Sequence, residues 1–127
     1  MTAPTLDLLP HQIDEYRLTA AEHQKSRVAK NKARLEKAWA LAKKAAEVLR
    51  EQYHVTRVAA FGSMLHEERF TEWSDVDIAA WGIATDQTFR AIGTVMDLDA
   101  SIEINLVDVN TCTNSLREAI EAEAVSL

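Results

Sequence analysis

The chain has 127 residues, of which 47% are hydrophobic and 27% charged, an ordinary composition for a globular protein with a formal net charge of −6. This length allows one domain and excludes a separate substrate domain. One cysteine, Cys112, excludes an internal disulfide, and no apolar run approaches the ~20 residues of a membrane span. No basic stretch precedes the short apolar patch at the start. We therefore expect a cytoplasmic protein without a secretory signal.

The charges are divided unevenly along the chain. Residues 11–52 hold ten Lys and Arg against six Asp and Glu, whereas residues 53–127 hold four against thirteen. The front of the chain is therefore basic and the body acidic. An acidic body argues against direct binding of DNA through that part.

Residues 1–10 contain both prolines, and we expect them to form a poorly ordered lead-in. Residues 11–53 contain no Gly or Pro and are rich in helix-forming residues. Apolar residues in the second half are spaced 4, 3, 4, 3 and 4 apart, which predicts an amphipathic helix: Leu35, Trp39, Ala42, Ala46, Leu49 and Tyr53.

One helix of that extent would be about 60 Å long, more than the width of a small domain. It must therefore break near residues 22–32 or project beyond the body. We favour a projecting helix whose second half packs on a sheet. The first half belongs to an extension of residues 1–34. It would then contact another chain, either a different protein or a second copy of this one.

The segment 25–37 carries six basic residues and one acidic residue. We interpret it as a solvated helix face. The alternative function is binding of RNA or of a triphosphate.

Two strands and a polar connection follow the helix. We expect strands at 55–61 and 75–81, closed by Gly62 and Gly82. In the connection between them, His66 is interpreted as an exposed loop residue rather than a ligand.

The rest of the chain alternates between helix and strand. Thr85 is the predicted N-cap of a helix that ends near Leu98, with Phe89, Ile92 and Met96 in the core. Further elements are expected at 101–107 (strand), 114–124 (helix) and 125–127 (edge strand).

Acidic side chains gather on the second strand. Asp75 and Asp77 are two residues apart, so they lie on one face of the strand, where their repulsion calls for a cation, a proton or a basic partner. Gly62 and Ser63 end the preceding strand and suit a phosphate. If the strands 75–81 and 101–107 are neighbours, Glu103 lies beside the two aspartates, about 5 Å away between Cβ atoms of an opposed pair.

Three converging carboxylates can hold one or two Mg²⁺ ions, which clamp the two oxygens of an in-line displacement. The expected reaction is nucleotidyl transfer. Asp75 and Asp77 would bridge both cations. Glu103 would bind the cation on the acceptor side and help to deprotonate the attacking hydroxyl. Gly62 and Ser63 would hold the β- and γ-phosphates.

The segments FGS and SDVDIAAW resemble the polymerase-β-type nucleotidyltransferase superfamily, whose hallmark is Gly-Ser, a spacer of about ten residues and Asp-x-Asp. The length, the order of elements and the closing SLREAIEAEAVSL resemble its minimal members. The resemblance covers residues 38–127. It implies an α+β, polymerase-β-like fold with a small mixed sheet flanked by helices, as a domain of residues 35–127 behind a long extra N-terminal helix.

Many minimal nucleotidyltransferases are similar to antitoxins of a HEPN-domain toxin, a helical RNase, and some transfer AMP from ATP to a tyrosine of that partner. The resemblance therefore implies a Mg²⁺-dependent adenylyltransferase that acts as an antitoxin. The alternative is a non-catalytic antitoxin or assembly subunit of the same fold. Antibiotic nucleotidylation is disfavoured because the chain has no length for a second domain.

Three details depart from the family pattern. The spacer, residues 64–74, has eleven residues, and His66-Glu67 stand near the place where the family often has Arg-Gly. Arg69 is the candidate for the missing triphosphate contact. The third acid is Glu103 rather than the commoner Asp.

Overall fold

A four-stranded mixed sheet is the centre of the protein, which we describe from a computed structural model over residues 10–127. The strand order is β3-β2-β1-β4. Strand β2 runs antiparallel to β1 and parallel to β3, and β4 runs antiparallel to β1. The strands are β1 (Arg57–Phe61), β2 (Val76–Trp81), β3 (Ile104–Asp108) and β4 (Val125–Ser126).

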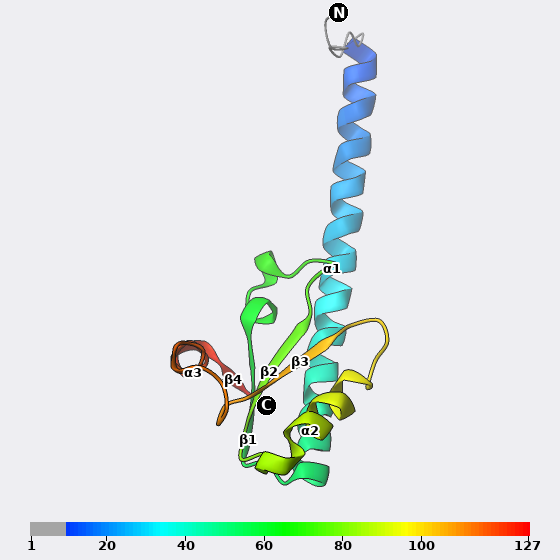
Figure 1. Ribbon diagram of the computed structural model, residues 1–127. Coiled ribbons are helices and arrows are strands. Elements are labelled where there is room, and N and C mark those ends of the chain that lie inside the picture. Colours follow the sequence, from blue (N-terminus) through cyan, green and yellow to red (C-terminus); the bar gives the residue numbers. More distant parts are fainter. Residues whose placement is uncertain (1–9) are drawn as a thin grey trace, which may run out of the picture.

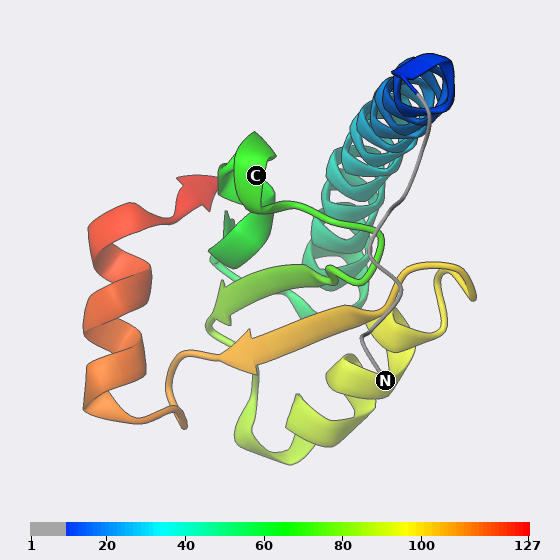
Figure 2. The same ribbon diagram turned by 90° about the horizontal axis from the view of Figure 1, so that it is seen from above.

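Helices cover the sheet from both sides (Figures 1 and 2). The α-helices are α1 (Pro10–Tyr53), α2 (Thr88–Met96) and α3 (Asn114–Glu123), and the short 3-10 helices are η1 (Gly62–Leu65), η2 (Glu67–Arg69) and η3 (Thr85–Gln87). Helices α1 and α2 pack on one face, which we call the closed face, and α3 lies on the opposite, open face. The predicted α+β class is confirmed. Within residues 10–127, no helix combines the length and apolar character needed to cross a membrane.

The closed face carries the main core. Val76, Ile78 and Ala80 alternate along β2 and are fully buried against α1 and α2. Helix α1 contributes mostly small side chains such as Ala42 and Ala46, which let the helix lie close to the sheet. The predicted stripe from residue 35 to residue 53 is thus confirmed as the packing face of α1.

The open face is covered only in part. Ile120 of α3 packs against Ala79 and Val109, with Trp81 partly buried beside them. These residues lie toward the end of β2, so α3 leaves the beginning of that strand uncovered. The strand start, with Asp75 and Asp77, is therefore the accessible part of the open face.

Helix α1 is continuous over 44 residues, about 66 Å, and does not break near residues 22–32. Residues 10–33, which we call the arm, extend beyond the body (Figure 1). Where the arm's side chains are described, all are exposed except the half-buried Asn31. The predicted projection is confirmed, whereas contact of the arm with another chain stays a prediction. The expected lead-in falls almost entirely on residues 1–9, outside the described residues.

The prediction for the helix after β2 was wrong in two respects. Thr85 is not the N-cap, because it lies within η3 and α2 begins only at Thr88. Phe89 is 90% exposed and Met96 43% exposed. Ile92 does pack partly buried against the core, as predicted. The fully buried side chains of α2 are Ala91 and Val95.

The basic segment 25–37 divides into two parts. Arg34 donates hydrogen bonds to the carbonyl oxygens of Ser74 (2.9 Å) and Ser101 (3.3 Å), and Lys37 donates to the Ser101 hydroxyl (2.7 Å). These two residues tie α1 to the loops before β2 and β3. The remaining basic side chains of the segment are exposed: Lys25, Arg27, Lys30 and Lys32.

The loop before β3 has an ordered carboxylate. Asp99 accepts hydrogen bonds from the Ser101 hydroxyl (2.6 Å) and the Ser101 amide (2.7 Å), and it lies 3.4 Å from the Lys37 ammonium. Ser101 and then Lys37 lower the pKa of Asp99 to about 2. Asp99 therefore helps to connect α1 to this loop and does not belong with Asp75 and Asp77.

Candidate active site on the open face

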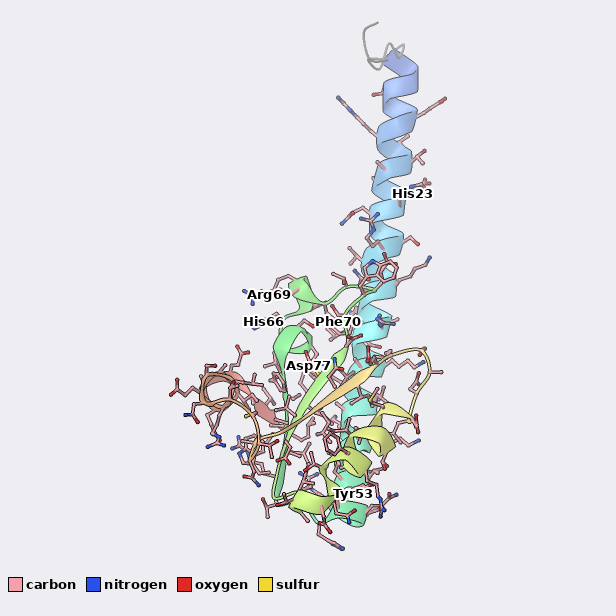
Figure 3. All side chains as sticks on the ribbon, viewed as in Figure 1. His23, Tyr53, His66, Arg69, Phe70 and Asp77 are labelled. Carbon is pink, nitrogen blue, oxygen red and sulfur yellow. The ribbon has the colours of Figure 1, made fainter. Side chains whose placement is uncertain are left out.

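Asp75 and Asp77 lie at the uncovered end of the open face. Asp75 immediately precedes β2, and Asp77 is its second residue, paired with Phe61 on β1 and with Asn105 on β3. Both side chains are half-buried. Figure 3 shows Asp77 on the strand below the short helical connection that carries His66 and Arg69. The sheet thus holds the two predicted carboxylates close to the Gly-Ser turn.

Asn105 joins the two aspartates. Its amide nitrogen donates to Asp77 Oδ1 at 3.3 Å and to Asp75 Oδ2 at 3.5 Å. Across residues 10–127, no other side chain hydrogen-bonds or ion-pairs with either carboxylate. The open-face group of Asp75, Asp77 and Asn105 therefore contains two acids and one neutral amide.

Glu103 does not complete this group as the sequence predicted. The strands β2 and β3 are neighbours, as expected, and their parallel register pairs Val76 with Ile104, which puts Glu103 level with Asp75, and Asp77 with Asn105. Glu103 precedes β3, its side chain is exposed, and its carbonyl oxygen accepts a hydrogen bond from the Val76 amide (2.9 Å). In the described part of the chain, no three His, Cys, Asp or Glu side chains gather closely enough to hold a metal ion. The expected group of three carboxylates is thus not formed.

The sequence-based prediction of the site did not include Asn105, because an amide is a less obvious ligand than a carboxylate. The alternation of Ile102, Ile104 and Leu106 with polar residues already places Asn105 on the same face as Glu103. Which of the two lies beside Asp77 depends on the register, and the register is a property of the folded sheet.

Gly62 approaches the Asp77 carboxylate closely. Its φ of +79° lies in the region that favours glycine, and a Cβ built on it would be 2.6 Å from Asp77 Oδ2. Ser63 follows in η1 and is half-buried, with its carbonyl oxygen accepting from the His66 amide (3.1 Å). The backbone of this turn and the Asp77 carboxylate consequently share one small space.

Burial raises the pKa of Asp77 above its usual range, and the nearby charge of Asp75 acts in the same direction, while the hydrogen bond from Asn105 partly offsets both. The group contains no cationic side chain. Two neighbouring carboxylates without a cationic partner are a donor set that fits one Mg²⁺ ion, which takes its other ligands from water and phosphate oxygens. The chemistry of these residues therefore suits a single divalent cation.

The connection 64–74 is ordered into η1 and η2. Met64 and Phe70 are buried and anchor it to the core of the closed face. The side chain of Arg69, at the end of η2, is exposed at the same end of the sheet as the aspartates (Figure 3). His66 is half-buried rather than exposed, and its Nδ1 lies 3.9 Å from Glu68 Oε1. The eleven-residue spacer therefore carries Arg69 on a short helix of defined position.

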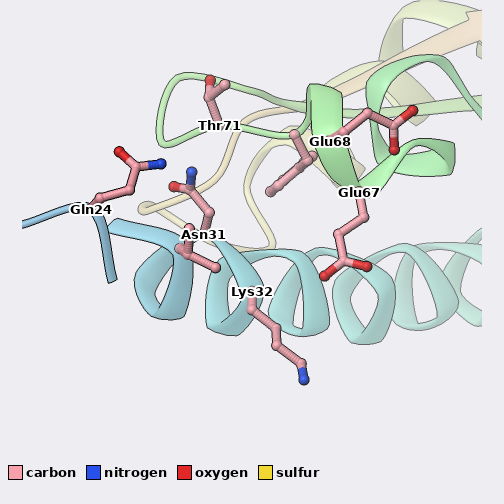
Figure 4. Close-up of a pocket in the computed structure, with 8 residues that line it drawn as sticks. Gln24, Asn31, Lys32, Glu67, Glu68 and Thr71 are labelled. Carbon is pink, nitrogen blue, oxygen red and sulfur yellow. The ribbon is translucent and has the colours of Figure 1, made fainter. Parts of the chain in front are cut away.

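A groove of about 380 Å³ separates the arm from this connection (Figure 4). Gln24, Val28 and Asn31 line it from α1, and Phe70 and Thr71 line it from the other side. No local pattern predicts this groove, because it forms between the arm and the connection 64–74, which are distant in the chain. It lies apart from the open-face group, since none of that group's residues lines it.

Comparison with known proteins gives no family assignment: no protein-family model matches the chain, and no curated protein matches it.

Proposed function

We propose that this protein is a Mg²⁺-dependent nucleotidyltransferase that takes AMP from ATP and attaches it to a HEPN-type toxin, so that it acts as the antitoxin. The single observation that carries the proposal is the close approach of Gly62 to the Asp77 carboxylate. It brings a turn suited to phosphate and a carboxylate suited to Mg²⁺ to the same uncovered end of the sheet.

Each residue of the proposal has a defined task. Asp75 and Asp77 would hold Mg²⁺, which when bound would neutralise their repulsion and supply positive charge for the phosphates. The backbone amides and hydroxyl of Gly62-Ser63 contact the β- and γ-phosphates, and the exposed Arg69 reaches the triphosphate from η2. Glu103, whose carbonyl oxygen pairs with Val76, is the candidate acceptor of the proton of the attacking hydroxyl.

A protein acceptor agrees with the shape of this face. Helix α3 covers only the end of β2, so a bulky acceptor can approach the aspartates. The exposed arm offers a second surface for the same partner. These two features support a protein acceptor over an enclosed pocket for a small antibiotic.

The second candidate function is a non-catalytic antitoxin that neutralises its partner by binding. Asn105 favours it, because the amide stands beside Asp77 where a third carboxylate was expected. A site with two acids can still bind a nucleotide as a structural ligand. The two candidates therefore differ in chemistry rather than in fold.

Incubation with ATP labelled at the α-phosphate, Mg²⁺ and the co-encoded HEPN-type protein separates them. Transfer of label to the partner supports the enzyme, and an intact complex without label supports the binding antitoxin. The double variant Asp75→Ala/Asp77→Ala should lose transfer and remain folded, because it removes two repelling charges.

A matched control removes two exposed carboxylates that lie away from the group, in the variant Asp86→Ala/Asp97→Ala. It should retain full transfer. If the Asp75→Ala/Asp77→Ala variant labels the partner normally, the site assignment is wrong.

A further inference from the structure

Asn105 has a position that no acid in the described chain shares. It lies inside β3, directly beside Asp77 in the parallel register, and its amide reaches both Asp75 and Asp77. The side chain is on the exposed side of the strand, between the buried Ile104 and Leu106. Asn105 is therefore placed to orient both carboxylates and also to face whatever they bind.

The charge of the group follows from this arrangement. Asp75 and Asp77 carry two negative charges when ionised, and one divalent cation balances them. An acid at position 105 would place a third negative charge within hydrogen-bonding distance of both, which a second cation or a proton would have to offset. The neutral amide removes that requirement and donates a hydrogen bond to each carboxylate instead.

We propose that Asn105 is a positioning residue that limits the open-face group to one divalent cation. This inference rests on the proposed function, since it assumes that the group binds Mg²⁺ with a nucleoside triphosphate. The single cation serves the phosphates, and no protein-held cation serves the acceptor hydroxyl. Asn105→Asp would create the place for a second cation.

The test counts cations rather than products. Wild-type protein, saturated with a non-hydrolysable α,β-methylene analogue of ATP, is titrated with Mn²⁺ and the bound ions are counted by electron paramagnetic resonance. We expect one Mn²⁺ per chain in the wild type and two in Asn105→Asp. The control Asn110→Asp makes the same chemical change at an exposed turn residue and should bind one.

Thermal unfolding gives a second readout. Without metal, Asn105→Asp should melt below the wild type because of the added repulsion. Mn²⁺ should raise its midpoint by more than it raises that of the wild type, since two bound ions stabilise the folded state more than one. Asn105→Ala should still bind one Mn²⁺, about ten- to a hundredfold more weakly, because the carboxylates lose the group that orients them.

The outcomes separate this inference from the proposed function. Two Mn²⁺ ions in the wild type, or one in Asn105→Asp, overturn the role of Asn105 and leave the proposed nucleotide site intact. No binding of Mn²⁺ or of the analogue to folded wild-type protein overturns both. An unchanged Mn²⁺ affinity in Asn105→Ala contradicts the positioning role alone.

Discussion

The two faces of β2 differ most at the start of the strand, although their residues alternate along it. Ile78 is 0% exposed beneath α1 and α2, whereas its neighbour Asp77 lies half-buried on the open face with a carboxylate and an amide as partners. Burial on the closed face stabilises the fold through apolar contacts. On the open face, burial acts against folding by raising the pKa of Asp77. The main core thus lies on the closed face, whereas the open face has a smaller apolar cluster under α3 and the candidate site at the start of β2.

This division also explains the arrangement of the helices. Helix α1 covers the closed face with its second half, and α3 covers the far end of the open face. Neither α1, α2 nor α3 covers the region of Asp75 and Asp77, where the turn that begins η1 approaches Asp77. The following predictions test the division, beginning with the change of largest expected effect.

Ile78→Ala should lower the free energy of unfolding by about 2–5 kcal/mol, because it leaves a cavity in the closed-face core. Urea unfolding followed by circular dichroism measures the loss. Val107→Ala, at a half-buried position of the open face, is the matched control and should cost less. Equal costs at the two positions would contradict the proposed difference between the faces.

Gly62→Ala should destabilise the protein by about 1–2 kcal/mol, because alanine at a φ of +79° is strained and its Cβ would meet the Asp77 carboxylate. It should also weaken binding of ATP analogues. Gly93→Ala in α2 is the control, since a Cβ there meets nothing within 4 Å and should stabilise the helix by about 0.5–1 kcal/mol. Titration calorimetry and thermal unfolding check both variants.

Arg34→Ala should cost about 1 kcal/mol, because it removes the hydrogen bonds that α1 donates to the loops before β2 and β3. Both loops lead into the open-face group, so hydrogen exchange should rise at Ser74 and Ser101. Lys44→Ala changes an exposed cation on the same helix and should alter neither measurement. No change in exchange in Arg34→Ala would show that the two faces are independent.

Asp77→Asn should have the smallest effect, a modest rise in stability at neutral pH. Because burial raises the pKa of Asp77, the folded protein holds its proton to higher pH than the unfolded chain does. Wild-type stability therefore falls as the pH rises from near 3.8 through the raised pKa, and the variant lacks this fall. Thermal unfolding across this pH range should show that the midpoints of the two proteins converge at low pH. A difference in midpoint that does not change with pH would contradict the raised pKa of Asp77 as its cause.

Much of the open face could be read from local pattern. The spacing of Asp75 and Asp77 placed both on one face, and the strand ends at Phe61 and Trp81 agree with the structure. The edge strand at residues 125–127 was also predicted and forms as β4. Pattern was a poorer guide for α2, which begins only after η3 and leaves Phe89 and Met96 exposed.

The sequence by itself determined the elements and the faces of the strands, because side-chain alternation and helical spacing depend only on local backbone geometry. The tertiary structure alone decided two things: the register that puts Asn105 beside Asp77, and the part of the open face that α3 covers. Pairing across these strands joins residues about thirty positions apart, such as Asp77 and Asn105. No local pattern contains that information, so the neutral partner of the two aspartates became visible only in the folded sheet.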